Sequence, residues 1–344
     1  MAGLVKLQPG KGDFVYRTDL KIPEIEDDEV LIKVKCTAVC GTDMHMMEWD
    51  KWSQLRVKTP LIPGHETAGV IVETGASVRD RKAGDRVSCE THIPCGTCWF
   101  CMNGMPHICS NVRLFGATED GAFAEYAKIK AGNTFLLDDS ISDEMACLFE
   151  PLGAGVHGVE KAEPEGKAIL VSGCGPIGLT AVSAAKTLGA DRVIACDIVD
   201  ERLEAALKMG ADHVVNSAEK DLAGEVRKLC GGIGADAAID ITGAGKAIIN
   251  SLKSVRAGGK VVCVGLPTQE IPLDLTNDLI YREVELTGVS GRLIWKTWED
   301  FSAVMRGPYF KPDLIMGQRF AMKDFDKAAA LIRSGHTGKM IIYP

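Results

Sequence analysis

The segment KAILVSGCGPIGLTAVSAAKTLGADRVIACD, residues 167–197, decides the fold class of this chain. It contains an apolar run, a glycine-rich turn, a stretch of helical composition and a second apolar run, in that order. This order predicts a short buried strand, a helix and a second buried strand. Because a helix that links two buried strands sets them parallel, the segment indicates a βαβ unit.

The same alternation continues downstream of this segment. Stretches of helical character at 201–210 and near 223–230 alternate with strand-like stretches at 212–216, 235–243 and 259–265. Apolar strands that alternate with helices are typical of a parallel sheet covered on both faces. We therefore expect an α/β domain with a doubly wound parallel sheet.

The glycine-rich turn has the spacing G-x-G-x-x-G between a predicted strand and a predicted helix. Its candidate coenzyme-binding residues are Gly173, Gly175, Pro176, Ile177 and Gly178. Glycines at these positions permit a tight turn, and the helix that follows offers free N–H groups to a pyrophosphate. Asp197 ends the next predicted strand, where an acid binds ribose hydroxyls and disfavours a 2′-phosphate. The pattern predicts NAD rather than NADP, although the neighbouring Arg202 could weaken that preference.

The overall composition excludes several classes of protein. The net charge of −8 argues against a nucleic-acid-binding surface, which needs a basic excess. No apolar run approaches the roughly 18 residues of a membrane-spanning helix. The N-terminal residues lack the pattern of a secretory signal. We expect a cytoplasmic protein whose partner is a small molecule, with no nucleic-acid or membrane partner.

Four of the twelve cysteines form a cluster with the spacing C-x2-C-x2-C-x7-C. They are Cys95, Cys98, Cys101 and Cys109. Four thiolates on one short loop can surround a tetrahedral zinc ion and leave no position open for a substrate. The spacing predicts a structural zinc site in a lobe at about residues 90–115. A disulfide framework is disfavoured because the cytosol keeps thiols reduced.

A second group of potential zinc ligands is dispersed along the chain. It consists of Cys40, His65, Glu66 and Glu150. A catalytic zinc needs three protein ligands and one exchangeable position, which Cys40, His65 and one of the two acids would satisfy. The residues alone leave open which acid takes part and whether the group meets in space.

These motifs occur together with others in a fixed order. The set comprises CGTDMH at 40–45, GHETAGVIVETG at 64–75, GDRV at 84–87, the four-cysteine loop, GAFAEY at 121–126, EP at 150–151 and GCGPIG at 173–178. The combination resembles the zinc-containing medium-chain alcohol dehydrogenases along essentially the whole chain. The resemblance implies a GroES-like, β-rich catalytic domain, split in sequence, around a Rossmann domain. We expect residues 1–154 and 296–344 in the catalytic domain and residues 155–295 in the NAD-binding domain.

The resemblance also implies roles for individual residues. Cys40, His65 and Glu150 are expected to bind the catalytic zinc, with Glu66 as an alternating ligand or a close neighbour. Thr42 is expected to take the proton of the substrate hydroxyl, and His45 to pass a proton towards solvent. The family implies two zinc ions per subunit, one catalytic and one structural, together with NAD and a homotetramer.

Within the family, some segments are most similar to the L-threonine 3-dehydrogenase subgroup. They are WDKWSQ at 49–54, the entry to the cysteine loop with His92, and GRLIWKTW at 291–298. The expected reaction is oxidation of a secondary alcohol, L-threonine to 2-amino-3-oxobutanoate, with His92 and Arg292 as candidate substrate residues.

The chain departs from the subgroup pattern at 47–48 and in the stretch 153–157. A polyol or vicinal-diol dehydrogenase is therefore an alternative enzyme. A non-catalytic dinucleotide-binding protein is the alternative from another class, because a fold does not prove a function.

Overall fold

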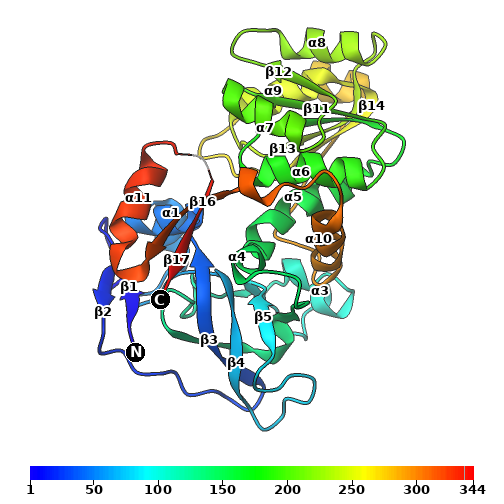
Figure 1. Ribbon diagram of the computed structural model, residues 1–344. Coiled ribbons are helices and arrows are strands. Elements are labelled where there is room, and N and C mark those ends of the chain that lie inside the picture. Colours follow the sequence, from blue (N-terminus) through cyan, green and yellow to red (C-terminus); the bar gives the residue numbers. More distant parts are fainter. Residues whose placement is uncertain (337) are drawn as a thin grey trace. The chain divides into compact units, whose positions relative to one another are not determined.

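The computed structural model describes residues 1–336 and 338–344. The chain forms two compact units, one made of Met1–Pro151 and Met316–Pro344 and the other of Leu152–Ile315 (Figure 1). Among the described residues, no helix is both long enough and apolar enough to cross a membrane.

The first unit is built on a β-sheet that combines strands from residues 29–136 with the two C-terminal strands. In its described part, seven strands pair in the order β16-β17-β3-β4-β5-β9, with β8 added beside β3. Their bounds are β3 Glu29–Ala38, β4 Glu66–Thr74, β5 Arg86–Cys89, β8 Tyr126–Lys130, β9 Thr134–Leu136, β16 Met316–Ala321 and β17 Lys339–Tyr343. The last strand, β17, pairs antiparallel with β3, so Ile341 lies opposite Ala38. The C-terminal segment thus completes a sheet that begins near residue 29.

Two small hairpin-like sheets and several short helices surround this sheet. The strands are β1 Gly3–Val5 with β2 Val15–Arg17, and β6 His92–Ile93 with β7 Arg113–Leu114. The α-helices are α1 Gly41–Glu48, α2 Lys51–Arg56, α3 Trp99–Met102, α4 Asp143–Cys147 and α11 Phe325–Arg333, and α5 Phe149–Ala162 starts in this unit.

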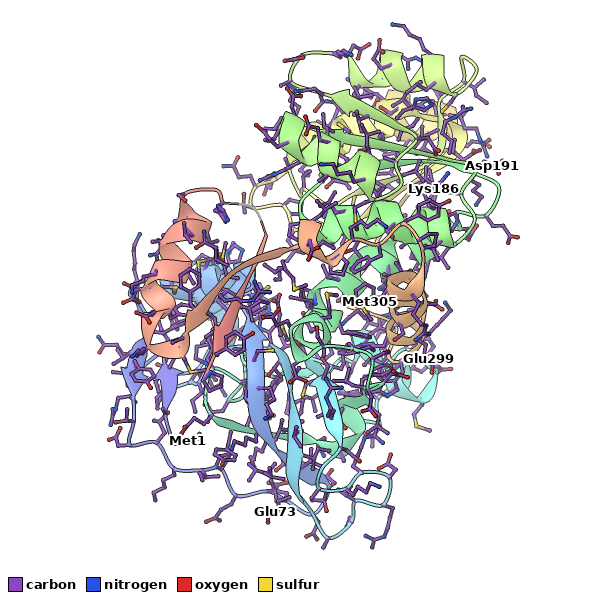
Figure 2. All side chains as sticks on the ribbon, in the orientation of Figure 1. Met1, Glu73, Lys186, Asp191, Glu299 and Met305 are labelled. Atoms are coloured by element: carbon purple, nitrogen blue, oxygen red, sulfur yellow. The ribbon has the colours of Figure 1, made fainter. Side chains whose placement is uncertain are left out.

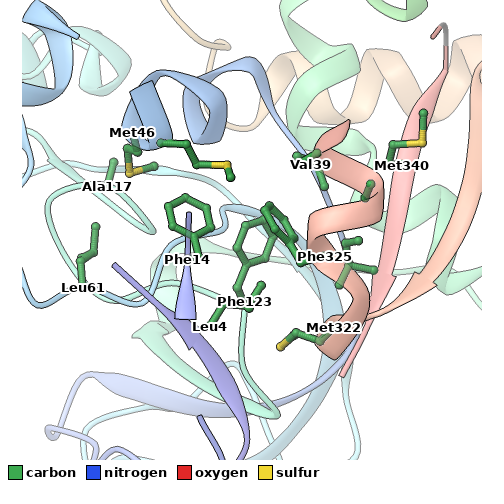
Figure 3. Close-up of a cluster of buried hydrophobic side chains, with 14 of the residues drawn as sticks. Leu4, Phe14, Val39, Met46, Leu61, Ala117, Phe123, Met322, Phe325 and Met340 are labelled. Carbon is green, nitrogen blue, oxygen red and sulfur yellow. The ribbon is translucent and has the colours of Figure 1, made fainter. Parts of the chain in front are cut away.

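An aromatic cluster fixes the C-terminal helix α11 against the N-terminal part of the unit (Figure 3). The ring centroids of Phe123 and Phe325 are 5.2 Å apart, and those of Phe14 and Phe325 are 5.4 Å apart. All three rings are buried, and Met46 of α1 belongs to the same cluster. Fully burying a side chain of this size contributes roughly 1.5–3 kcal/mol. The packing therefore stabilises the return of the chain to the first unit.

The second unit contains a six-stranded parallel sheet. Its strand order is β12-β11-β10-β13-β14-β15, and every pair in this order is parallel. The strands are β10 Ala168–Ser172, β11 Arg192–Asp197, β12 His213–Asn216, β13 Ala235–Asp240, β14 Val255–Cys263 and β15 Glu285–Gly288. The order reverses between β10 and β13, which is where ligands bind in doubly wound sheets. The predicted doubly wound α/β fold is confirmed.

Helices connect and cover these strands (Figure 1). They are α6 Pro176–Thr187, α7 Asp200–Lys208, α8 Leu222–Leu229, α9 Gly245–Ser254 and α10 Lys296–Arg306. Helix α6 starts with Pro176 in its first turn, a position where the missing N–H of proline costs nothing. Its buried face is rich in alanine, which allows the helix to pack closely on the sheet.

The second unit ends at Ile315, later than the end at residue 295 that the sequence predicts. The difference arises from α10, which carries Glu299 and Met305 in Figure 2 and packs against α6. Trp298 and Phe301 of this helix are buried, and Phe301 contacts the ring of Phe310. An amphipathic helix belongs to whichever unit buries its apolar face, and the sequence does not show which one that is.

Candidate metal centres and coenzyme site

Three of the dispersed candidate ligands meet in the first unit. The ligand atoms of Cys40, His65 and Glu66 all lie within 4.8 Å of one another. Strand pairing explains the meeting, because β3 and β4 are antiparallel and Ala38 lies opposite Glu66. Cys40 follows two residues after the end of β3 and therefore lies beside the start of β4. Residues far apart in sequence thus become neighbours through the sheet register.

Local structure holds the first two ligands in place. Cys40 is the N-cap of α1, and its N–H donates to Asp43 Oδ2 at 2.8 Å. His65 follows Gly64, which has a φ of +91°. A Cβ at Gly64 would lie 2.4 Å from the ring of Phe123, so only glycine fits before this histidine.

The cluster has unmet bonding capacity that a cation would satisfy. His65 Nδ1 and Glu66 Oε2 are buried and have no hydrogen-bond partner among the described residues. Burial opposes protonation of His65, but the charges of Cys40 and Glu150 raise its pKa to about 10. A thiolate, an imidazole and a carboxylate are the donors that zinc prefers in proteins. The residues present therefore fit a zinc ion.

A buried ion pair fixes the orientation of Glu66. Lys339 Nζ donates to Glu66 Oε1 at 2.5 Å and to the carbonyl oxygen of Val39 at 3.1 Å. Both side chains are largely buried. Burial lowers the pKa of Lys339, but the charges of Glu66, Cys40 and Glu150 together outweigh burial, so the net pKa is raised. One carboxylate oxygen of Glu66 is thus held by Lys339, and the other belongs to the cluster.

The second acidic candidate lies outside this group of three. Glu150, in the first turn of α5, is 6% exposed, and its Oε1 accepts a hydrogen bond from Thr91 Oγ1 at 2.6 Å. Its charge nevertheless acts on His65. The acid that the structure gathers with Cys40 and His65 is Glu66, while Glu150 stays a proposed ligand.

The four-cysteine cluster forms the second candidate metal centre. The Sγ atoms of Cys95, Cys98, Cys101 and Cys109 also lie within 4.8 Å of one another. Backbone N–H groups point at these sulfurs, including that of Cys98 to Cys95 Sγ and that of Asn111 to Cys109 Sγ, both at 3.3 Å.

These donors prepare the cluster for a metal ion. Hydrogen bonds from Thr97 lower the pKa of Cys95 to about 5, and the backbone at Cys101 lowers that of Cys98 to about 7. Burial, together with the hydrogen bonds to the neighbouring sulfurs of Cys98 and Cys109, raises the pKa of Cys101 to about 12. Four converging sulfurs fit a tetrahedral zinc ion with no open position.

The second unit contains a cavity at the carboxyl ends of its strands. Its volume is about 790 Å³, within the range of small-molecule sites. The predicted residues that line it are Gly173, Gly175, Pro176, Ile177, Asp197 and Arg202. A Cβ at Gly175 would meet nothing within 4 Å, so the turn faces open space there. A phosphate can approach the backbone at this point.

Gly178, the last glycine of the motif, has a different task. A Cβ at Gly178 would lie 1.8 Å from the carbonyl oxygen of Gly173, which itself has a φ of +96°. Gly178 does not line the cavity, but it lets α6 pack closely against the turn.

Asp197 is buried and held by backbone N–H groups. Its Oδ2 accepts from the N–H of Cys174 at 2.7 Å, and its Oδ1 accepts from the N–H of Ile198 at 2.7 Å. Arg202 Nη1 lies 3.8 Å from Oδ2. The carboxylate is therefore fixed at the cavity wall with lone pairs left for a ribose diol.

Comparisons with known proteins agree with this geometry. Residues 26–139 match the alcohol dehydrogenase GroES-like domain, and residues 176–306 match the zinc-binding dehydrogenase family. The L-threonine 3-dehydrogenase of Pyrococcus horikoshii is 40% identical over 344 residues, which cover 99% of this chain and 98% of that protein. This chain belongs to the zinc-containing alcohol dehydrogenases. The enzyme class and the GroES-like domain expected from the sequence are confirmed.

Solved structures of other family members have the same fold. The 2R,3R-butanediol dehydrogenase of Bacillus subtilis has a TM-score of 0.88 at 25% identity, covering 100% of this chain and 99% of that one. A zinc-binding dehydrogenase of Sinorhizobium meliloti 1021 with bound NADP also has a TM-score of 0.88, at 27% identity and the same coverage. These structures match the fold of this chain along essentially its whole given length.

The expected proton-transfer residues of this alcohol dehydrogenase lie on α1. Thr42 Oγ1 is 3.6 Å from Cys40 Sγ, so the hydroxyl lies beside the metal cluster. His45 is partly exposed, and its Nδ1 lies 2.7 Å from Asp50 Oδ2. His45 lies about one helical turn after Thr42 on α1, and Asp50 orients its imidazole. This arrangement is compatible with the roles expected for both residues.

The two candidate substrate residues lie in different units. His92 is in the first unit, with Nδ1 2.8 Å from Oε1 of the buried Glu90. Arg292 is in the second unit and is only 3% exposed. Its side chain packs against Gly153, where an added Cβ would lie 2.7 Å from Arg292 Cδ. Gly153, which precedes the departures from the subgroup pattern at 154 and 155, therefore leaves room for this arginine.

Sequence reasoning missed several residues that support the sites. Lys339, Asp43 and Thr91 contact candidate metal ligands, and Glu90 contacts His92. The available signal was weak: a lysine begins the apolar strand KMIIY, and Glu90 and Thr91 are two of several polar residues in the segment 87–93. Such residues become informative only when their burial is known.

Proposed function

We propose that this alcohol dehydrogenase oxidises L-threonine at C3 with NAD, yielding 2-amino-3-oxobutanoate, NADH and a proton. The observation that carries the proposal is the buried cluster of Cys40, His65 and Glu66, whose free lone pairs suit a catalytic zinc. The substrate, L-threonine, is inferred from the similarity of this chain to the L-threonine 3-dehydrogenase of Pyrococcus horikoshii over 99% of its residues.

The proposed catalytic zinc is held by Cys40, His65 and an acid, either Glu66 or Glu150. Bound zinc supplies a Lewis acid that lowers the pKa of a coordinated hydroxyl. Thr42 accepts the hydroxyl proton, and His45 passes a proton to solvent. NAD supplies the acceptor for the hydride that leaves C3. A second, structural zinc is proposed at the four cysteines.

We propose NAD rather than NADP as the coenzyme, although one family member of similar fold binds NADP. Asp197 is 7% exposed and its carboxylate is fixed at the cavity wall. A 2′-phosphate placed against this carboxylate would meet a like charge, whereas the ribose hydroxyls would donate hydrogen bonds to it. The neighbouring Arg202 already lies beside Asp197 and only partly offsets that charge.

Substrate recognition is assigned to charged and polar side chains. L-Threonine carries an ammonium and a carboxylate, so its site needs an anion and a cation. We propose His92 and Arg292 as substrate residues, with Arg292 for the carboxylate and one of the acids, Glu66 or Glu150, for the ammonium. A polyol would have no use for this charge pair.

We further propose a cytoplasmic homotetramer. The edge strand β15 ends the parallel sheet, and the apolar side chains of Leu266, Ile280, Tyr281 and Leu286 are exposed in the same unit. Unpaired edges and exposed apolar side chains favour association with another chain. All twelve cysteines are free thiols, which suits a reducing compartment. Light scattering of the purified protein tests the tetramer.

The test of the proposed function is NADH formation by zinc-loaded protein near neutral pH. L-Threonine is compared with D-threonine, L-serine, 2,3-butanediol and sorbitol, each with NAD and with NADP. A preference for L-threonine with NAD supports the proposal. A preference for butanediol or sorbitol would keep the zinc enzyme and refute the substrate. No alcohol-dependent NADH formation at all would favour a non-catalytic dinucleotide-binding protein.

A further inference from the structure

A buried carboxylate with no assigned role lies beside the coenzyme cavity. Asp240 is the last residue of β13 and is completely buried. It lies opposite Ser172, the last residue of β10. The two strands meet at the point where the strand order reverses, so Asp240 is at the carboxyl edge of the sheet below the cavity.

Asp240 binds the loop that connects β13 to α9. Its Oδ2 accepts from the N–H of Gly243 at 2.9 Å, and its Oδ1 accepts from Thr242 Oγ1 at 2.8 Å. Thr242 Oγ1 in turn accepts from the N–H of Ala244, the N-cap of α9, at 3.0 Å. A single carboxylate therefore determines the path of three consecutive residues.

Burying a carboxylate here costs free energy because its charge loses contact with water, so its hydrogen bonds are needed to stabilise it. Burial raises the pKa of Asp240 above its usual value, while the donors from Gly243 and Thr242 act in the opposite direction. A buried carboxylate is tolerated only where donors compensate for the lost water. The side chain of Ser172 on β10 also lowers this pKa. The donors from Gly243 and Thr242 come from the loop, so the loop and the carboxylate stabilise each other.

The loop forms part of the cavity wall and has no room to shift. Ile241, Thr242 and Ala244 line the cavity. A Cβ at Gly173 of the glycine-rich turn would lie 2.7 Å from Thr242 Cγ2. A Cβ at Gly265, on the other side, would lie 2.1 Å from the backbone nitrogen of Gly243. Any change in the loop therefore reaches the turn that is assigned to the pyrophosphate.

We propose that Asp240 is a positioning residue for the coenzyme: it holds the 241–244 loop against the glycine-rich turn and so shapes the wall to which NAD binds. This inference rests on the proposed coenzyme but not on the proposed substrate. Asp240 acts through Gly243 and Thr242 and does not itself need to touch the dinucleotide.

The test is Asp240→Asn, assayed by titration of NADH fluorescence and by steady-state kinetics with L-threonine. The amide nitrogen cannot accept a hydrogen bond, so one of the two loop donors loses its partner. We expect the dissociation constant for NADH and the KM for NAD to rise on the order of tenfold. The KM for L-threonine and the kcat at saturating NAD are expected to change much less.

Asp236→Asn is the matched control. Asp236 lies near the other end of β13, where it accepts from the N–H of Ala168 at 2.8 Å and from Arg256 Nε at 2.7 Å. It is an aspartate on the same strand with a similar bonding pattern, and it does not line the cavity. We expect Asp236→Asn to lower thermal stability without changing NADH affinity.

Thr242→Val tests the same inference if Asp240→Asn does not fold. Valine keeps the methyl group that faces Gly173 and removes the hydroxyl that links Asp240 to Ala244. We expect weaker NADH binding here as well. Unchanged NADH affinity in Thr242→Val and in folded Asp240→Asn, or an equal loss in Asp236→Asn, would overturn the proposal.

The readout also separates this inference from the proposed function. NADH binding is measured without an alcohol, so a wrong substrate leaves the test intact. Wild-type protein that binds NADH but does not oxidise L-threonine refutes the substrate alone. Wild-type protein that binds no NADH refutes the coenzyme, and this inference with it.

Discussion

The two candidate metal centres of the first unit differ in how the chain assembles them. The four-cysteine centre comes from a single loop, and its four ligands lie between residues 95 and 109. The cluster of Cys40, His65 and Glu66 comes from a helix N-terminus and the start of a strand, which the pairing of β3 with β4 brings together. A local centre depends on the metal to order its loop, whereas a dispersed centre depends on the sheet to order its ligands.

The largest effect is expected from removal of the thiolate ligand of the dispersed centre. Cys40→Ser should lower kcat with L-threonine by more than about a hundredfold. The loss of a ligand weakens zinc binding, and with the zinc the site loses the positive charge that polarises the substrate hydroxyl. The fold should persist, since the sheet rather than the metal builds this site. Metal analysis should show one zinc fewer per chain, with an unchanged circular dichroism spectrum. Cys263→Ala, at the end of β14, is the control.

The corresponding change in the local centre should affect order more than chemistry. Cys98→Ser should release the other zinc, expose the 95–113 loop to proteolysis and lower the melting temperature by several degrees, because this loop has little regular structure of its own. Activity at low temperature should fall less than in Cys40→Ser. Limited proteolysis and activity measured side by side check the contrast. Equal activity loss in both variants with intact loops would contradict it.

A third change tests whether a distant strand supports the dispersed centre. Lys339→Met removes the cation from a buried pair and leaves Glu66 charged and uncompensated on that side. Breaking such a pair costs about 3–5 kcal/mol. Urea unfolding of the protein should show this loss. Lys327→Met removes an exposed lysine that pairs with Asp324 and should leave the unfolding midpoint unchanged.

The coenzyme site combines both modes of assembly. Its glycine-rich turn comes from a single segment, whereas Asp197 comes from the end of the next strand, β11. Asp197→Asn should raise the KM for NAD on the order of tenfold and reduce the discrimination against NADP, because the like charge facing a 2′-phosphate is removed. Kinetics with both coenzymes measure this ratio. Asp191→Asn, just before β11 and labelled in Figure 2, should leave it unchanged.

The smallest effect concerns the C-terminal return of the chain. Arg319 on β16 binds Glu144 on α4 through two hydrogen bonds, at 2.6 and 2.7 Å. The hydrogen bond from Arg319 lowers the pKa of Glu144, so the pair stabilises the fold at neutral pH and loses this contribution as the pH falls through that lowered pKa. Arg319→Gln should lower the melting temperature slightly at pH 7 and not at all at strongly acidic pH. A pH-independent difference would contradict the assignment.

Much of the molecule was predictable because its signals are local. The βαβ alternation predicted the parallel sheet, and the strands β10 to β14 lie where the apolar runs indicated them. The glycine spacing predicted the turn at the cavity, since Gly173 and Gly178 are required by close contacts within or beside that turn. The cysteine spacing likewise predicted a group of converging sulfurs.

Other features could not be predicted from local patterns. Helix α10 belongs to the second unit because Trp298 and Phe301 are buried there, and its own sequence shows only that it is amphipathic. The sequence offered both Glu66 and Glu150 as acidic ligands, and the family resemblance favoured Glu150. The pairing of β3 with β4 brings Glu66 to Cys40 and His65, while Thr91 binds Glu150.

The sequence by itself determined the class of the protein: a dinucleotide-binding parallel sheet, a β-rich partner domain, a four-cysteine loop and the ligand types for a catalytic zinc. Only the tertiary structure showed that Glu66 lies beside Cys40 and His65, that Lys339 pairs with Glu66 from the last strand, and that Asp240 binds the cavity loop. The physical reason is that spacing along the chain encodes bonds within a segment. The pairing of charges between segments depends on burial and strand register, which arise only when distant segments pack together.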